Sequence, residues 1–119
     1  MKNQDKEILL KDLCARLLYG VECEIRQREG CSPVLYDKLT CGTIKGVKEY
    51  DWCVKPYLRP MSSMTEEEIR IEREFQQDCF FGRKPLVILT DFYYSRNLDV
   101  NGLIEKGLAI EAPEGMYNF

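Results

Sequence analysis

Two spacings of apolar residues divide the first part of the chain. Over residues 5–18 a leucine recurs at every fourth position from Leu9 to Leu17, which predicts an amphipathic helix. Gly20 suits the end of that helix, because the residue after a helix often needs a left-handed backbone. Apolar and charged residues then alternate over residues 21–26, which predicts a strand with one buried face.

Short apolar runs joined by turn residues follow and predict a meander. The runs cover residues 33–36, 39–44, 47–50 and 52–54. Strands this short, with tight turns between them, favour a small antiparallel sheet that curls into an SH3-like barrel. The prolines within residues 55–60 are expected to break the sheet, because proline donates no N–H to a ladder.

Helix signals dominate the second half of the chain. Thr65 and Glu68 have the spacing of a capping box, and Ser63 with Glu66 repeats it. The predicted helix runs to residue 80 or 81, where Gly82 stops it.

The last forty residues carry weaker signals. Residues 86–94 fit either a helix or a strand, and periodicity leaves both open. Asp99 is expected to cap a short helix through Lys106, and residues 108–110 fit a last edge strand. Residues 116–119 form a tail that must dock or fray.

These patterns predict one α+β domain over residues 1–119. It consists of an N-terminal helix, a small antiparallel sheet or SH3-like barrel, and two or three C-terminal helices. Residues 20–58 form its strand-rich half and residues 61–119 its helix-rich half. Neither half buries enough surface to be expected to fold alone.

Composition narrows the classes of function. The 119 residues carry a net charge of -3 and no histidine. Without histidine, the Ser-His-Asp and Cys-His mechanisms and nearly all catalytic zinc sites are excluded, so neither an enzyme nor a cofactor is expected. The chain has no apolar run of about 18 residues and no secretory signal, which predicts a cytoplasmic protein that does not enter the membrane.

Six cysteines have no metal-binding spacing. None forms a C-x-x-C pair, and a reducing compartment disfavours disulfides. Free thiols, buried or half-buried, are the prediction, and a metal site built from distant cysteines is the alternative. The six are Cys14, Cys23, Cys31, Cys41, Cys53 and Cys79.

Three segments resemble one family of proteins. They are LKDLCARL at residues 10–17, KPYLRPMSSMTEEE at residues 55–68 and GLIEKGLAIEAPEGMY at residues 102–117. These segments are similar to short uncharacterised proteins carried by gut bacteria and their phages. The resemblance implies a phage or mobile-element setting and brings no catalytic residue or cofactor with it. The chain departs from the family at residues 91–96, where relatives often carry a Trp-containing segment rich in His.

Two groups of side chains are candidate binding surfaces. The first combines cations with aromatic residues around Trp52, as single-strand binders do, and consists of Lys45, Lys48, Tyr50, Lys55, Tyr57 and Arg59. Its structural alternative is a core tryptophan with lysines that protect edge strands. The second resembles protein-binding hot spots and consists of Arg83, Lys84, Tyr94 and Arg96.

Three functions follow from these observations. The leading one is a non-enzymatic binding protein of phage type that acts through a protein partner, with a host process such as immunity as its target. The first alternative is a module that binds a nucleotide or single-stranded nucleic acid. The second is an enzyme that works through carboxylates alone, such as Glu22 with Glu24 or Glu49 with Asp51. A homo-oligomer is compatible with each of the three functions.

Overall fold

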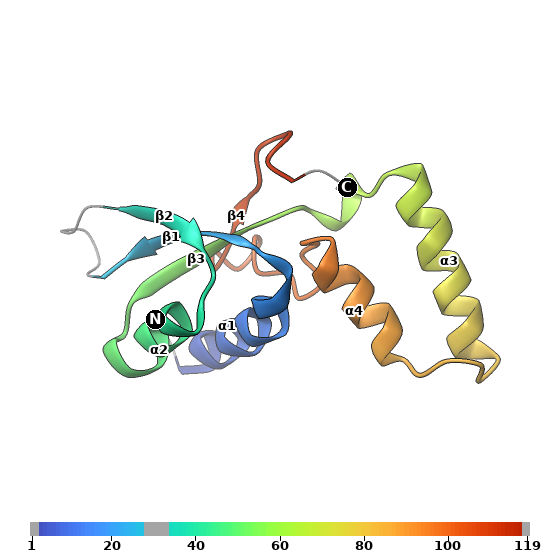
Figure 1. The fold of residues 1–119 in the computed structure, drawn as a ribbon, viewed down its shortest axis with the longest axis horizontal. Helices are drawn as coiled ribbons and strands as arrows, with labels where there is room; N and C mark the ends of the chain where they lie inside the picture. Colours follow the sequence, from blue (N-terminus) through green and yellow to red (C-terminus); the bar gives the residue numbers. More distant parts are fainter. Residues whose placement is uncertain (1–2, 28–33, 118–119) are drawn as a thin grey trace.

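The computed structural model describes residues 3–27 and 34–117 as an open sheet with helices against it and a helical hairpin at one end (Figure 1). Its elements are α1 (Asn3–Arg16), β1 (Glu22–Arg26), β2 (Leu35–Lys38), α2 (Cys41–Tyr50), β3 (Cys53–Leu58), α3 (Glu66–Phe80), α4 (Val87–Ser95) and β4 (Ile110–Glu111). Two 3-10 turns are η1 (Leu17–Tyr19), after α1, and η2 (Met61–Ser63), before α3. The predicted α+β class and the order of helix, sheet and helices are confirmed.

The four strands form one sheet in the order β2-β1-β3-β4, and this sheet is mixed rather than antiparallel throughout as predicted. β1 pairs antiparallel with β2 and β3, whereas β3 pairs in parallel with β4. Alternation along β1 and β3 buries Cys23 and Val54 in the core with Leu9 of α1 and Val47 of α2. One face of the sheet therefore packs on α1 and α2.

The sheet does not close into the predicted SH3-like barrel, because residues 39–50 supply a helix where two strands were expected. The Thr40 hydroxyl starts α2 by accepting the Thr43 N–H at 3.2 Å. Thr43 and Val47 are buried at helical spacing. The β-branched residues that favoured strands here thus lie on the inner face of a helix, and the predicted turn at residues 45–46 lies inside it.

α2 packs closely against the residue that leads into β3. A Cβ atom added to Gly46 would lie 2.0 Å from Trp52 Cε3, well inside van der Waals contact. Trp52 itself is half-buried at the edge of the core. The Trp52 ring can therefore pack directly on α2 because Gly46 has no side chain.

β3 runs through Pro56, where the sequence predicted a break. The neighbouring Tyr57 carbonyl accepts a hydrogen bond at 2.7 Å from the Tyr117 hydroxyl, which accepts one at 2.9 Å from the Glu22 N–H of β1. The N–H and C=O groups of successive strand residues point to opposite sides of the strand. Those of Tyr57 therefore point toward β1, and those of Pro56 point away from it. β4 begins only beside Tyr57, so the N–H that Pro56 lacks breaks no described ladder bond.

The capping box at the start of α3 is confirmed. The Thr65 hydroxyl accepts the Glu68 N–H at 3.2 Å, and the Glu68 carboxylate accepts the Thr65 N–H at 3.0 Å. The helix ends where it was predicted to end, and residues 86–94 resolve into a helix, α4, not a strand.

The predicted short helix over residues 99–106 is a series of turns. Asp99 still caps it, since its carboxylate accepts the N–H groups of Leu103 and Ile104 at 2.7 and 3.0 Å. Gly102 has a φ of 71°, a left-handed conformation that interrupts a helix. The predicted last strand is present, shifted to Ile110–Glu111.

A buried ion pair joins α1 to the segment after α4. The Arg16 side chain is fully buried, and its Nε donates to Asp12 Oδ1 at 2.5 Å. Arg16 Nη2 donates to the Leu98 carbonyl at 2.7 Å, and Asn101 Nδ2 donates to Asp12 Oδ2 at 2.8 Å. The guanidinium carbon lies 4.9 Å from the centre of the Tyr94 ring. This network links the core under the sheet with the smaller apolar cluster between α3 and α4.

Candidate functional site

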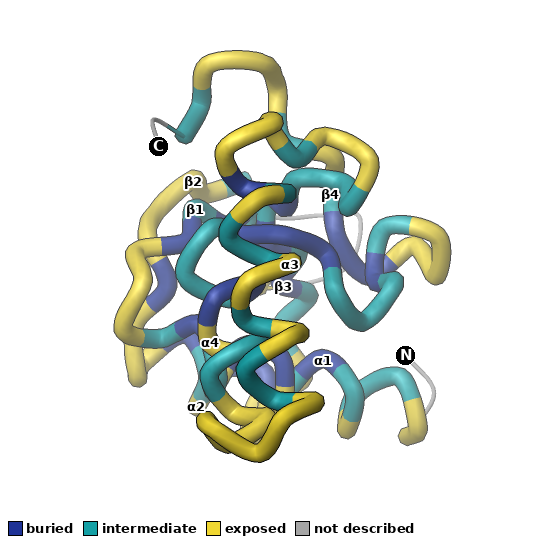
Figure 2. The backbone as a smooth tube through the Cα atoms, turned by 90° about the vertical axis from the view of Figure 1, so that its right-hand side faces the viewer, coloured by how far each residue is buried: buried dark blue, intermediate teal, exposed yellow. Residues whose placement is uncertain are grey.

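The end of the α3–α4 hairpin exposes large apolar side chains. α3 ends at Phe80, and Gly82, with a φ of 70°, turns the chain back toward α4. We call the four side chains that surround this turn the hairpin tip: Phe80, Phe81, Leu86 and Val87, with exposed fractions of 83%, 66%, 67% and 56%. Figure 2 looks along the molecule onto the hairpin, and the connecting loop is coloured as exposed.

Basic residues surround the hairpin tip. The Arg83 guanidinium carbon lies 5.2 Å from the centre of the Phe81 ring. Arg83 and Lys84 both reach Asp78, at 3.2 and 3.5 Å. Arg73 lines a shallow depression of about 340 Å³ with Phe80. Arg83 and Lys84 thus share one carboxylate beside the tip.

The structure divides the first predicted surface between two sides of the sheet. Lys45, Lys48 and Tyr50 are exposed on α2, which packs on the buried face of the sheet. Lys55 and Tyr57 alternate with the buried residues of β3 and so lie on the opposite face. The grouping assumed that residues 45–59 were neighbouring strands, and the helix at 41–50 removes that adjacency.

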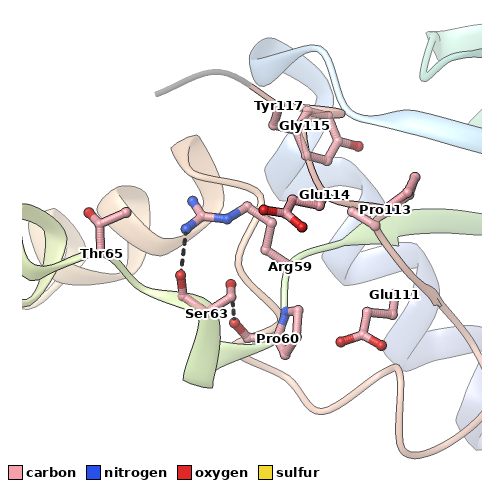
Figure 3. A pocket seen from close by; sticks show the side chains of 10 residues that line it. Arg59, Pro60, Ser63, Thr65, Glu111, Pro113, Glu114, Gly115 and Tyr117 are labelled. Atoms are coloured by element: carbon pink, nitrogen blue, oxygen red, sulfur yellow. Dashed lines mark hydrogen bonds between the residues drawn. The ribbon is translucent and has the colours of Figure 1, made fainter.

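Arg59, the sixth member of the first surface, is tied into the structure. Its Nη2 and Nη1 donate to the two carboxylate oxygens of Glu68 at 2.6 and 2.9 Å. Arg59 also lines a groove of about 690 Å³ between residues 59–65 and 111–117 (Figure 3). The Glu68 side chain is 1% exposed, so this two-pronged pair fixes the end of β3 to the start of α3.

The second predicted surface is split along α4. Arg83 and Lys84 lie at the hairpin tip, whereas Tyr94 and Arg96 lie at the other end of the helix. The Tyr94 hydroxyl accepts a hydrogen bond from Asn101 Nδ2 at 3.1 Å. The sequence analysis named Arg83 and Lys84, which are exposed, but it named none of the four apolar residues of the hairpin tip. No pattern near Phe80 and Phe81 marked them as exposed, because an apolar stripe at helical spacing can hold two successive residues.

The predicted carboxylate pairs are largely engaged with cations. Three of the four carboxylates have one within 4 Å: Glu24 pairs with Arg26 at 3.1 Å, Glu49 with Lys45 at 3.9 Å, and Asp51 with Lys6 at 2.5 Å. The pairs of Glu49 and Asp51 are of the kind that solvated surface charges make, whereas the pair of Glu24 is partly buried.

The five described cysteines are free thiols, as predicted, and Cys31 lies outside the described residues. Burial was predicted wrongly for Cys14 and Cys41, which are exposed on the helices α1 and α2, whereas Cys23 is buried in the core and Cys53 and Cys79 are half-buried. Burial raises the pKa of the Cys23 thiol to about 12, which keeps it protonated and unreactive at neutral pH. Within residues 3–27 and 34–117, no three Cys, Asp or Glu side chains are grouped so as to hold a metal ion.

Comparisons with protein-family models, curated proteins and solved structures find no match to this chain. Among the helices of the described residues, none combines the length and the apolar character needed to cross a membrane.

The Arg59–Glu68 pair predicts the response of stability to acid. Hydrogen bonds from Arg59 lower the pKa of Glu68 from 4.5 to about 2. Because the pKa of Glu68 is lower in the folded than in the unfolded protein, its ionised form stabilises the fold. This stabilisation is fully present above pH 4.5 and is lost as the pH falls toward 2. Because one pKa unit corresponds to about 1.4 kcal/mol, we expect Glu68 to account for about 3 kcal/mol of that acid loss.

The measurement is urea unfolding, followed by circular dichroism, at pH values from 7 down to 2. Glu68→Gln should lower the free energy of unfolding at pH 7 and flatten its decline below pH 4.5. Glu67→Gln, on the exposed side of the same helix turn, is the matched control and should retain the decline. An acid decline of the same steepness in Glu68→Gln as in the wild type would contradict the assignment.

Proposed function

We propose that this is a small binding protein that acts through a protein partner, and that the hairpin tip is its docking surface. The observation that carries the proposal is the exposure of four large apolar side chains at one projecting end of the molecule. Apolar groups gathered in this way on a soluble domain are typical of interaction sites. Aromatic side chains beside arginine are also the composition of binding hot spots.

Charge defines the surface that the partner must present. The tip is apolar at its centre, and two cations, Arg83 and Lys84, share the single carboxylate of Asp78 beside it. A complementary partner has an apolar pocket with an acidic rim, because opposite potentials favour encounter and register. Salt should therefore slow association more than it speeds dissociation.

The resemblance to proteins carried by gut bacteria and their phages favours a bacterial host protein as this partner. A host process such as immunity is the target that we propose. The nucleic-acid alternative remains a prediction, and the surface it requires is divided between α2 and the far face of β3.

The test compares captured proteins from a gut-bacterial extract by quantitative mass spectrometry. The tip variant Phe80→Ser/Leu86→Ser removes two exposed anchors, and burial of each is worth about 1.5–3 kcal/mol. The matched control Tyr36→Ser/Tyr50→Ser removes two side chains that are 67% and 63% exposed elsewhere. All three proteins should fold with similar stability, because the changed side chains are exposed.

We expect one protein to be retained by the wild type and by the control and to bind the tip variant at least about tenfold more weakly. Equal retention by all three proteins would contradict the proposal. So would tip-dependent binding to vesicles of anionic lipid in place of a protein, because an aromatic and basic tip is also suited to a membrane surface.

A further inference from the structure

β2 forms an apolar edge of the sheet. It comes first in the strand order β2-β1-β3-β4, so among the described strands only β1 lies beside it. Val34, Leu35 and Tyr36 are three successive apolar residues at its start, and Leu35 and Tyr36 are 49% and 67% exposed. Exposed edges of this composition tend to pair with a strand of another molecule. Strand addition is therefore expected here unless a contact in the molecule opposes it.

The opposite edge of the sheet offers less to an incoming strand. β4 consists of two residues, and Pro113, which has no N–H to donate, follows shortly after it. β2 has four residues, all exposed, and none of them is a proline. A contact that blocks pairing therefore matters most at the edge of β2.

One outward N–H group of β2 is already bonded. The Leu39 N–H donates to the carbonyl of Val21, the residue before β1, at 2.9 Å, so it points toward β1. Successive residues of a strand direct their N–H groups to opposite sides, so the Lys38 N–H points away from β1 and toward the free edge. There the Asp37 carboxylate accepts it at 2.7 Å. A side chain of β2 thus occupies a donor of its own free edge.

We propose that the contact between the Asp37 carboxylate and the Lys38 N–H closes this edge to strand addition. A strand that added here would bond with the outward backbone groups of Tyr36 and Lys38, because those of the residues between them face β1. The Lys38 N–H already has a charged acceptor, which is a strong one. An incoming carbonyl oxygen would have to displace that carboxylate, and its own partial negative charge would be repelled by it. The contact is thus an autoinhibitory one, built from two successive residues.

Asp37→Ala tests the proposal, because it removes the acceptor and leaves the Lys38 N–H free. In a solution of the pure protein, the strand that can add is β2 of a second copy. Sedimentation velocity from micromolar to millimolar concentration measures this association. We expect Asp37→Ala to associate at a concentration at least about tenfold lower than the wild type does. Asp37 is exposed, so circular dichroism should show an unchanged fold.

Two further variants separate the hydrogen bond from the charge. Asp37→Asn removes the charge, as Asp37→Ala does, but its amide oxygen still accepts the Lys38 N–H. We therefore expect Asp37→Asn to associate no more than the wild type. Asp37→Ala/Lys38→Pro removes the N–H itself and should return association to the wild-type level, because a proline whose nitrogen faces the outside of an edge strand breaks no ladder bond.

Three results would overturn the proposal. The first is association of Asp37→Ala no stronger than that of the wild type. The second is equal association of Asp37→Asn and Asp37→Ala, which would show that the charge alone keeps the molecules apart. The third is undiminished association of the double variant, which would place the new contact elsewhere. β2 lies far from the α3–α4 hairpin (Figure 1), so none of these results depends on whether the hairpin tip binds a protein.

Discussion

Replacing Asp12 with alanine is expected to lower the free energy of unfolding by about 3 to 5 kcal/mol. The change removes the counter-charge of Arg16, whose side chain has no exposed surface and whose Nη1 already lacks a hydrogen-bond partner within the described structure. Asn101 loses its acceptor on Asp12 at the same time. Because small domains are stable by about 5 to 15 kcal/mol, this single change brings the protein close to unfolding.

Urea unfolding followed by circular dichroism measures this loss. Glu7→Ala, an exposed acid on the same helix, is the matched control and should change stability by less than about 0.5 kcal/mol. The double variant Asp12→Leu/Arg16→Met should recover most of the loss, because an apolar pair of similar volume leaves no buried charge. A loss below about 1 kcal/mol in Asp12→Ala would show that Arg16 reaches solvent.

Adding one methyl group at Gly46 is expected to lower the free energy of unfolding by about 2 to 3 kcal/mol. Alanine favours a helix by about 1 kcal/mol over glycine, but here its Cβ would lie 2.0 Å from Trp52 Cε3, so the indole must move. Trp52 is the single tryptophan of the chain, and its fluorescence reports the displacement as a shift to longer wavelength.

Gly42→Ala is the matched control within the same helix. A Cβ at Gly42 meets Thr40 Oγ1 at 3.6 Å, an ordinary contact, so the helix preference of alanine should prevail. We expect this variant to raise stability by up to about 1 kcal/mol and to leave the Trp52 emission unchanged. If both glycine variants stabilised the protein, the close packing of α2 against Trp52 would be wrong.

Elements with local signals could be predicted from the sequence, and elements fixed by distant contacts could not. The capping box of Thr65 and Glu68 lies within four residues, and it marked the start of α3 correctly. α2 was missed because the β-branched Thr43 and Val47 favour strands locally, whereas burial against the sheet selects a helix. The path of β3 through Pro56 depends on where β4 begins, some fifty residues later in the chain.

In the candidate site, too, properties of single residues could be predicted, whereas the grouping of residues from different elements could not. The cations Arg83 and Lys84 were singled out correctly as surface residues, because charged side chains are rarely buried. The first predicted surface failed as a group, because side chains on β3 and α2 face opposite ways once residues 41–50 are helical. The exposure of Phe80 was not predictable, since it follows from where the hairpin projects rather than from any residue near it.

The hydroxyl of Tyr117 has a consequence for the order in which the sheet is completed. It stands between the Glu22 N–H and the Tyr57 carbonyl, where a direct ladder bond would otherwise form, and it lies 95 residues from Glu22 in the chain. Closing so long a loop is slow compared with forming a helix or a hairpin. During synthesis, β1 and β3 leave the ribosome long before Tyr117 does. One end of the β1–β3 ladder therefore stays without its bridging hydroxyl until Tyr117 has been made.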